Sequence, residues 1–306
     1  MKGLNFFTIG LGFSLIFTLI VNGAESELEV FLMNNVYFPQ TVFLAQAPGD
    51  ILAKKTSFDP GIEAKSALVV KIDDNGRQTV LFDKNSGQKL QIASLTKLMT
   101  ALVSLETQPL SEKIEITPEI VSQEGESSLK IGEKIAVKEL MKMAIVESSN
   151  DAADALAEIY GRENFVNLMN FKAKEIGLRS TNFSTPTGLE AYNNFSTARD
   201  VANLTIFILK KYPLILNISA QASIIILSEN EEVHHRAFNT NELLTSFEEI
   251  ADLEIVGGKT GYTDESGGCI ILVLRDGDNY FVNVILGAGS RETRFSEMKK
   301  LIEAFN

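Results

Sequence analysis

The sequence predicts an α/β fold of the α+β type, in which one antiparallel sheet is built from both ends of the chain and a helical lobe packs beside it. Two observations predict this arrangement. β-rich runs occur at 66–82 and again at 254–286, and helical patterns fill the region between them, from 94 to about 212. We expect the functional site in the cleft between the sheet and the helical lobe.

The composition is that of a globular protein with a sizeable core. The 306 residues include 28 Lys and Arg against 40 Asp and Glu, a formal net charge of −12, and 45% of them are hydrophobic. Because an acidic surface repels phosphate groups, we expect no nucleic-acid partner. Cys269 is the single cysteine of the chain, so the fold does not depend on an internal disulfide.

The N-terminal segment 1–24 predicts export. After Lys2, residues 4–21 contain no charged side chain, and the chain turns acidic from Glu25 onward. A positive start before an apolar run is typical of an export signal, and this run is also just long enough to cross a membrane. We therefore expect a signal peptide or an N-terminal membrane anchor, and an extracytoplasmic location, periplasmic or at the outer face of the cytoplasmic membrane.

The next segment, 25–64, is predicted to be a spacer with little regular structure, because it has no sustained periodicity and is punctuated by proline and glycine. A single folded domain is predicted over 65–306. Its first elements are β-rich runs at 66–72 and 79–82, which the turn residues at 73–76 connect as a hairpin.

Helical patterns follow the hairpin. From Ser94, apolar residues recur at the i, i+3, i+4, i+7 spacing of a buried helix, at Leu95, Leu98, Met99, Leu102 and Leu105. Four more helices are predicted, with glycines as stops, at 137–144, 151–160, 163–176 and 197–211. The end of the chain predicts three strands and a last helix, at 254–258, 269–275, 280–286 and 291–305.

Familiar hydrolytic and nucleotide-binding motifs are missing from the sequence. The two histidines, His234 and His235, are adjacent, lack the H-E-x-x-H spacing of a zinc site, and are predicted to lie in a surface loop. There is no G-x-S-x-G elbow. Gly258-Lys259-Thr260 resembles the end of a phosphate-binding loop, but Leu253 stands where that loop requires glycine. We therefore expect neither a metal nor a cofactor.

A serine followed three residues later by a lysine is the remaining candidate for a nucleophile and its base. On a helix this spacing places both side chains on one face, and a lysine whose pKa is lowered by burial can take the serine proton. The spacing occurs at Ser86/Lys89, Ser94/Lys97, Ser127/Lys130 and Ser296/Lys299. Ser94 alone opens a strongly apolar helix, whose N-terminal N–H groups suit a developing oxyanion. The alternative is a capping serine beside a solvated lysine.

Two polar segments accompany this pair. Ser148-Ser149-Asn150 stands in a short break between two predicted helices, where helix capping is an alternative role. Lys259-Thr260-Gly261 follows a predicted strand, and Ser-x-Asn also recurs at 180/182 and 228/230. Together with Ser94 and Lys97, the two segments would form a site for a substrate that carries a carboxylate near a scissile amide.

Several longer matches occur in a fixed order. They are Ile92-Ala-Ser-Leu-Thr-Lys-Leu-Met-Thr-Ala101, Glu147-Ser-Ser-Asn-Asp-Ala152, Ser184-Thr-Pro-Thr-Gly-Leu189 followed by Ser196-Thr-Ala-Arg-Asp200, Asn239-Thr-Asn-Glu-Leu-Leu244 and Gly257-Gly-Lys-Thr-Gly-Tyr-Thr-Asp264. With them, the chain from 66 to 305 resembles the D-alanyl-D-alanine carboxypeptidases, low-molecular-mass penicillin-binding proteins. The resemblance implies a β-lactamase/transpeptidase-like fold. One departure is Ser149, where many relatives have glycine, and we expect it to narrow the cleft slightly.

The resemblance implies catalytic roles for three residues. Ser94 would attack the carbonyl between the two terminal D-alanines of a peptidoglycan stem peptide. Lys97 would take its proton, and Ser148 would relay a proton to the leaving amine. β-Lactam antibiotics would be covalent inhibitors, and any membrane attachment would come through 4–21.

The resemblance also implies four substrate-binding residues. Asn150 would bind the substrate amide, and Lys259 with Thr260 would hold the terminal carboxylate. The backbone N–H of Tyr262 would hold the oxyanion together with that of Ser94.

Three other functions share this machinery. A D,D-endopeptidase would cut peptidoglycan crosslinks with the same residues, a β-lactamase would hydrolyse its acyl-enzyme rapidly, and an inactive scaffold would bind the wall without turnover. Glu163 and Asn167 match the E-x-x-x-N motif of class A β-lactamases. Because they lie in a predicted helix soon after Asn150, we expect them to have no catalytic role.

Overall fold

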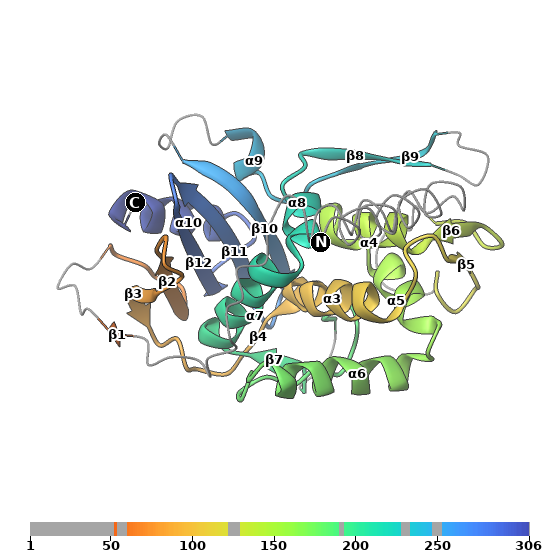
Figure 1. The fold of residues 1–306 in the computed structure, drawn as a ribbon, viewed down its shortest axis with the longest axis horizontal. Helices are drawn as coiled ribbons and strands as arrows, with labels where there is room; N and C mark the ends of the chain where they lie inside the picture. Colours follow the sequence, from red (N-terminus) through yellow and green to blue (C-terminus); the bar gives the residue numbers. More distant parts are fainter. Residues whose placement is uncertain are drawn as a thin grey trace, which may run out of the picture. The chain divides into compact units, whose positions relative to one another are not determined.

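The computed structural model describes residues 52–53, 60–121, 129–189, 193–227, 233–246 and 253–305. In this part of the chain, one six-stranded sheet has the order β1-β3-β2-β12-β11-β10 (Figure 1). Its strands are β1 (Leu52–Ala53), β2 (Ser66–Ile72), β3 (Gln78–Lys84), β10 (Glu254–Thr263), β11 (Gly267–Asp276) and β12 (Asn279–Ala288). The predicted α+β fold is confirmed. Each pairing in the sheet is antiparallel except that of β1 with β3, which is parallel.

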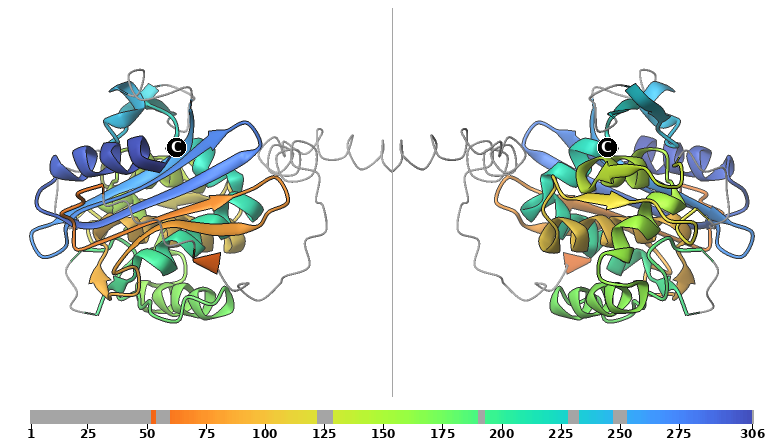
Figure 2. Two further views of the ribbon diagram at one scale, coloured as in Figure 1. Left: turned by 90° about the vertical axis from the view of Figure 1, so that its left-hand side faces the viewer. Right: turned by 90° about the vertical axis from the view of Figure 1, so that its right-hand side faces the viewer.

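Both faces of the sheet are buried, since successive side chains of a strand point to opposite faces. Leu68 and Val70 of β2 pack into the larger core cluster with the helical lobe. Val69, between them, packs into a smaller cluster with α10 (Thr293–Phe305). Figure 2 shows α10 on one face of the sheet and the helices of the lobe on the other. The sheet is therefore the middle of three layers.

The helical lobe follows the predicted order. It contains the 3-10 turn η2 (Ala93–Thr96) and the helices α3 (Lys97–Thr107), α4 (Val137–Val146), α5 (Asn150–Glu158), α6 (Arg162–Glu175), α7 (Ala198–Lys211) and α8 (Pro213–Ser219). The predicted helix from Ser94 is thus two elements, with Ser94 in η2 and the α-helix beginning at Lys97. Ala93 has a φ of +46°, and this left-handed residue turns the chain just before Ser94.

Three two-stranded pairs and a short helix complete the described structure. They are β4 (Leu90–Gln91) with β7 (Phe195–Ser196), β5 (Lys113–Glu115) with β6 (Lys134–Ala136), β8 (Ser223–Leu227) with β9 (Val233–Phe238), and α9 (Leu243–Ser246). The prediction that His234 and His235 lie in a surface loop is wrong, because both are on β9. Ile224 and Ile226 of β8 are buried, and the hairpin packs against α4.

The predicted spacer 25–64 is wrong at its C-terminal end. β1 lies within it, and Ile62 and Ala64 are buried in the cluster with α10. Glu297 of α10 accepts hydrogen bonds from the backbone N–H groups of Glu63, at 2.7 Å, and Ala64, at 3.0 Å. Residues just before 65 therefore belong to the folded domain.

The predicted export segment 1–24 lies outside the described residues, so it stays a prediction. Among the residues that the structure does describe, no single helix has the length and apolar composition of a membrane span. The pair α7 and α8 meets that test only when both are counted together across a bend of 106°.

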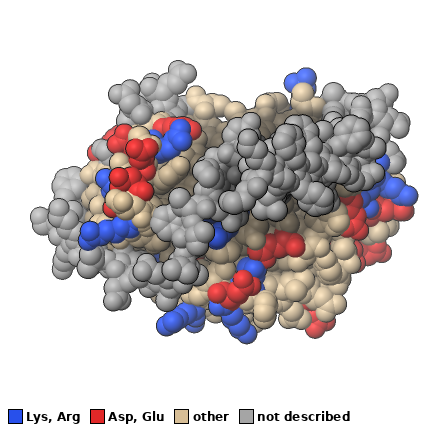
Figure 3. Space-filling view, viewed as in Figure 1, with Lys and Arg blue, Asp and Glu red and all other residues tan. Residues whose placement is uncertain are grey.

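Surface charge is mixed in sign. Figure 3 shows acidic and basic side chains interspersed over the face that it presents. Arg199 and Asp83, for example, form an ion pair of 2.7 Å with both side chains partly exposed.

Candidate active site

Ser94 and Lys97 meet as the sequence predicts. Lys97 Nζ lies 2.7 Å from Ser94 Oγ, 2.7 Å from Asn150 Oδ1 and 3.0 Å from the carbonyl oxygen of Thr187. The side chain of Lys97 is completely buried, so these three oxygens take the place of water around its amine. The alternative of a solvated lysine is therefore excluded.

Burial changes the chemistry of this amine. It lowers the pKa of Lys97 to about 7, because the charged form loses its hydration, and the carboxylate of Asp154 raises it by a smaller amount. A substantial neutral fraction therefore exists near neutral pH. A neutral amine this close to Ser94 can take the hydroxyl proton, so the pair has the chemistry of a nucleophile and base without histidine.

The break between α4 and α5 presents Ser148 to the opposite wall. Ser148 has a φ of +64°, an uncommon conformation for a residue with a side chain, and its hydroxyl lies 2.8 Å from Lys259 Nζ. The capping role belongs to Ser149, whose hydroxyl accepts a hydrogen bond from the N–H of Ala152. Asn150 is the first residue of α5. In this break, Ser149 therefore caps α5, whereas the adjacent Ser148 contributes its hydroxyl to the site.

The edge strand β10 forms the other wall of the site. It carries Lys259, Thr260 and Tyr262 and continues beyond the predicted end at 258. A Cβ atom on Gly261 would lie 3.0 Å from the backbone nitrogen of Ser94. Glycine therefore lets this strand run directly against the turn that carries the serine.

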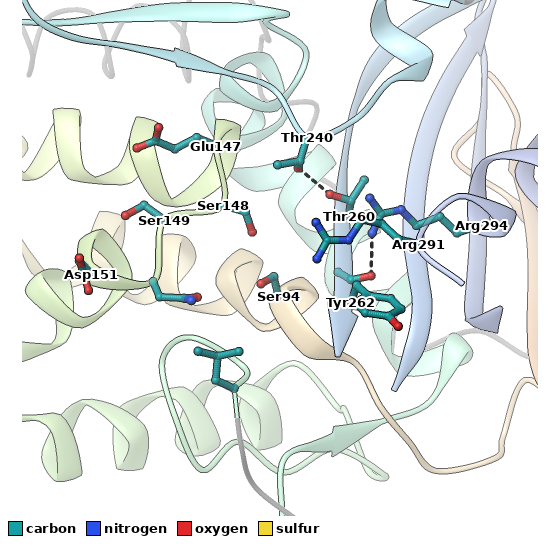
Figure 4. Close-up of a pocket in the computed structure, with 13 residues that line it drawn as sticks. Ser94, Glu147, Ser148, Ser149, Asp151, Thr240, Thr260, Tyr262, Arg291 and Arg294 are labelled. Carbon is teal, nitrogen blue, oxygen red and sulfur yellow. Dashed lines mark hydrogen bonds between the residues drawn. The ribbon is translucent and has the colours of Figure 1, made fainter. Parts of the chain in front are cut away.

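A pocket of about 500 Å³ separates the two walls. It is lined by Ser94, Glu147, Ser148, Ser149, Asn150, Asp151, Leu189, Thr240, Thr260, Gly261, Tyr262, Arg291 and Arg294. In Figure 4, Ser94 and Ser148 face Thr260 across this pocket, and the hydroxyl of Ser149 points away from Ser94. The pocket thus brings together the candidate residues from three distant segments, whereas Lys97 and Lys259 lie buried behind its lining.

Among the lining residues that were not predicted site residues, three contact the β10 wall of the pocket. Thr240 Oγ1 lies 2.6 Å from the hydroxyl oxygen of Thr260. Arg294 donates a hydrogen bond of 2.9 Å to the carbonyl oxygen of Gly261, and Arg291 lies 5.2 Å from the ring centre of Tyr262. The sequence signal that could have indicated Arg291 and Arg294 was the occurrence of two nearby arginines in the last predicted helix of an acidic chain. Both arginines make this end of the pocket cationic.

Lys259 lies buried beside this end of the pocket as a further basic group. Burial lowers its pKa well below the ordinary value, and the charges of Lys97 and Arg294 lower it further. An anion bound beside Lys259 opposes this lowering, because it favours the ammonium form. This end of the pocket is therefore suited to a carboxylate, which would find hydroxyl donors and positive charge together.

Comparison with known proteins identifies the family. Residues 53–290 match the model of the peptidase S11 family, described as D-alanyl-D-alanine carboxypeptidase. The chain belongs to this carboxypeptidase family. The resemblance predicted from the sequence motifs is thereby confirmed.

The share of each relative that aligns with this family member differs from one relative to the next. DacF, a D-alanyl-D-alanine carboxypeptidase of Bacillus subtilis (strain 168), is 34% identical over 249 residues, which are 79% of this chain and 61% of DacF. A D-alanyl-D-alanine endopeptidase of Escherichia coli (strain K12) is 32% identical over 266 residues, 85% of this chain and 82% of the relative. Penicillin-binding protein D2 of Listeria monocytogenes, solved in its ampicillin-bound form, has a TM-score of 0.66 at 27% identity, covering 82% of this chain and 99% of that one.

The other Ser-x-x-Lys pairs of this carboxypeptidase-family chain have different partners. The Ser86 hydroxyl donates to a carboxylate oxygen of Asp83 at 2.7 Å, and that of Ser296 donates to the carbonyl oxygen of Thr293 at 3.0 Å. Ser127 lies outside the described residues. Among the described pairs, only Ser94 therefore has its hydroxyl beside the amine of its own lysine.

The remaining motif matches do not reach the pocket. Glu163 and Asn167, which match the class A β-lactamase motif, are both on α6 and neither lines the pocket. Of the other Ser-x-Asn matches, 180/182 does not line it and 228/230 lies outside the described residues. Within the described ranges, no group of three or more His, Cys, Asp or Glu side chains is arranged to hold a metal ion.

A glycine in the loop behind Lys97 leaves no room for a side chain, and we expect Gly188→Ala to be strongly destabilising. Gly188 has a φ of +84°, and a Cβ there would lie 2.0 Å from the carbonyl oxygen of Ala93. Gly132 is a matched control, with a φ of +86° and no atom within 4 Å of a Cβ. In both variants, the left-handed backbone conformation of the alanine costs about 1–2 kcal/mol of the free energy of unfolding.

The clash should cost Gly188→Ala about 1–3 kcal/mol more than Gly132→Ala in the free energy of unfolding. Urea denaturation of the two variants measures this difference. Equal losses would show that the loop moves away from Ala93 without cost.

Proposed function

We propose that this protein is a serine-type D-Ala-D-Ala carboxypeptidase, which removes the terminal D-alanine from peptidoglycan stem peptides through an acyl-enzyme at Ser94. One observation carries the proposal. The buried Lys97 amine, with a pKa of about 7, lies 2.7 Å from the Ser94 hydroxyl at a pocket whose far end is cationic. Membership of the carboxypeptidase family supports the substrate class.

The acylation step uses the helical wall and the edge strand together. Ser94 Oγ attacks the carbonyl carbon of the bond between the two D-alanines, and its proton passes to Lys97 Nζ. The carbonyl oxygen becomes an oxyanion, which the backbone N–H groups of Ser94 and Tyr262 would bind. The close approach of β10 at Gly261 supports this arrangement.

The leaving D-alanine needs a proton and its carboxylate needs a partner. Ser148 would pass its proton to the leaving amine as the C–N bond breaks, and the proton that Lys97 took from Ser94 would replace it, so that Lys97 is again neutral. Lys259, whose Nζ lies 2.8 Å from the Ser148 hydroxyl, would hold that hydroxyl in place. Asn150 would bind the amide on the acyl side. Thr260 and Lys259, together with the arginines, would hold the carboxylate, and water then hydrolyses the Ser94 ester.

We expect a strong requirement for the substrate carboxylate. A peptide that ends in D-Ala-D-Ala should lose its terminal residue about 100-fold faster than the same peptide with a C-terminal amide, because the cationic end of the pocket is then left unpaired. Thr260→Val should reduce this preference. Chromatography of the released D-alanine or D-alanine amide measures both rates, and equal rates for the two peptides would contradict the proposed carboxylate site.

A D,D-endopeptidase that cuts crosslinks is the second candidate. One observation favours it, because the Escherichia coli relative that aligns over 82% of its own length is named a D-alanyl-D-alanine endopeptidase. A crosslinked muropeptide dimer offered beside a pentapeptide monomer separates the two activities. Faster cleavage of the dimer than release of D-alanine would make endopeptidase the main activity.

β-Lactams are the covalent ligands that we propose for the same serine. The Listeria monocytogenes relative was solved with ampicillin bound, which supports a β-lactam site in this fold. In such a reaction Ser94 opens the lactam ring and no leaving group departs, so the adduct remains on the protein. Its lifetime separates a carboxypeptidase from a β-lactamase, which would release it within seconds.

We further propose that the protein acts outside the cytoplasm. The uncharged run 4–21 after Lys2 supports export, and the same run would serve as an anchor if it is retained. The N-terminal sequence of the protein recovered from cell fractions tests both points. Recovery of the full chain in the cytoplasmic fraction would contradict export.

A further inference from the structure

One buried carboxylate of the helical lobe has no role in the steps described so far. Asp154 stands in α5 among alanines and a leucine that are fully buried, and is itself 1% exposed. Neither of its carboxylate oxygens accepts a hydrogen bond from the described residues. Burying such a group is costly, and its charge pairs with Arg162 of α6. This buried charge also lies where it can act on other groups of the lobe.

The position of Asp154 relates it to the reacting groups. It lies four residues after Asn150 on α5, so both side chains project from the same face of the helix. Asn150 Oδ1 is 2.7 Å from Lys97 Nζ, and α5 packs against α3, which begins at Lys97. On its other side, the Nε atom of Arg162 lies 3.1 Å from Asp154 Oδ1, and the arginine side chain is 45% exposed. Asp154 thus stands between a surface cation and the buried amine.

The charges around Asp154 come from three helices. Burial raises its pKa to about 6, Arg162 of α6 and Lys97 of α3 lower it, and Asp151 and Glu158 of α5 raise it. Lys97 in turn faces Lys259 of β10. Arg162 offsets part of the charge of Asp154, and the remainder acts on the amine through a poorly screening interior. Its effect is to raise the pKa of Lys97 against the lowering caused by burial.

We propose that Asp154 is a positioning residue of this site, whose buried charge, placed one helical turn from Asn150, keeps Lys97 a strong enough base to take the Ser94 proton. The inference rests on the proposed function, because it gives Asp154 its role through Lys97. A base that gives up its proton too readily is also a weaker acceptor in the transition state. The charge of Asp154 therefore moves the acid limb of the pH profile to higher pH and raises the reaction rate on the plateau above it.

The test is the pH dependence of acylation by a fluorescent penicillin, measured on the full chain between pH 5 and 9. Asp154→Asn removes the charge and keeps the shape, so the midpoint of the acid limb should fall by about half a pH unit or more, and the alkaline plateau should fall severalfold. Glu158→Gln makes the same chemical change one turn further along α5 on an exposed side chain, and its profile should match the wild type. Asp154→Glu keeps the charge and should keep the wild-type midpoint.

Each outcome bears on the inference. Coincident midpoints for the wild type and Asp154→Asn, with both proteins folded by thermal melting, would overturn it. If Asp154→Asn does not fold, Asp154→Ser removes the same charge with a smaller side chain and takes its place. A wild-type protein that is not labelled at any pH would instead contradict the proposed function, so the two failures are distinguishable.

Discussion

Ser94→Ala should abolish covalent labelling of the protein by a fluorescent penicillin, with the rate falling at least about a thousandfold. The reason is chemical rather than structural. The variant removes the hydroxyl that lies 2.7 Å from the Lys97 amine at the pocket, and alanine leaves no atom that can form the ester. The backbone N–H groups and the cationic end of the pocket remain, so non-covalent binding should persist. Gel fluorescence after denaturation measures the covalent fraction.

The other Ser-x-x-Lys serines are the matched controls. Ser296→Ala changes an exposed hydroxyl that bonds to a backbone carbonyl, and Ser86→Ala changes one that bonds to Asp83. Both variants, and Ser127→Ala, should label like the wild type. Loss of label in one of them while Ser94→Ala still labels would overturn the assignment of the nucleophile. A folded wild-type protein without any label would favour the inactive scaffold.

The sheet could be predicted from the sequence because its strands bury apolar side chains on both faces. The prediction failed where strand residues are polar. β10 was expected to end at 258, but it continues to Thr263 through Lys259 and Thr260, which are 2% exposed. A prediction based on hydrophobicity alone ends a strand where polar residues begin. In β10, however, the polar residues continue the strand and are buried, because they belong to the site. The error in the strand end therefore falls on the residues with proposed functions.

The site was predictable where one local segment supplies both partners. Ser94 and Lys97 are three residues apart, so one turn of helix can bring them together. Arg294 and Asp154 could not be found in this way. Arg294 reaches the pocket from the last helix by bonding to the carbonyl oxygen of Gly261 on a neighbouring strand. Asp154 is marked only by its burial, which a sequence does not show.

A third limit concerns backbone conformation. Ala93 and Ser148 both have positive φ values, although neither is glycine. Such conformations are expected at glycine or asparagine, so no sequence pattern indicated a turn at Ala93. The 3-10 turn that carries Ser94 was therefore expected to be part of an α-helix. In both cases the uncommon conformation adjoins or carries a hydroxyl of the site. Tertiary contacts around the pocket therefore determine these two positions.

Lys97→Gln should slow acylation by about 100- to 10,000-fold, because glutamine cannot accept the Ser94 proton. The pH profile should change as well. In the wild type, burial holds the pKa of Lys97 at about 7, so the neutral fraction falls as the pH drops below that value and acylation slows with it. Above that pH the rate reaches a plateau. The variant has no titrating amine at this position, so its remaining slow reaction should lack the acid limb.

Lys89→Gln is the matched control, since it changes the lysine of another Ser-x-x-Lys pair, whose amine lies 4.8 Å from the ring centre of Phe195. It should keep both the wild-type rate and the wild-type acid limb. Acylation rates of the three proteins between pH 5 and 9 decide the matter. If Lys97→Gln retained the wild-type acid limb, another group would be the base. Loss of rate together with the limb instead ties the titration to the amine beside Ser94, because a purely structural defect would lower the rate at every pH alike.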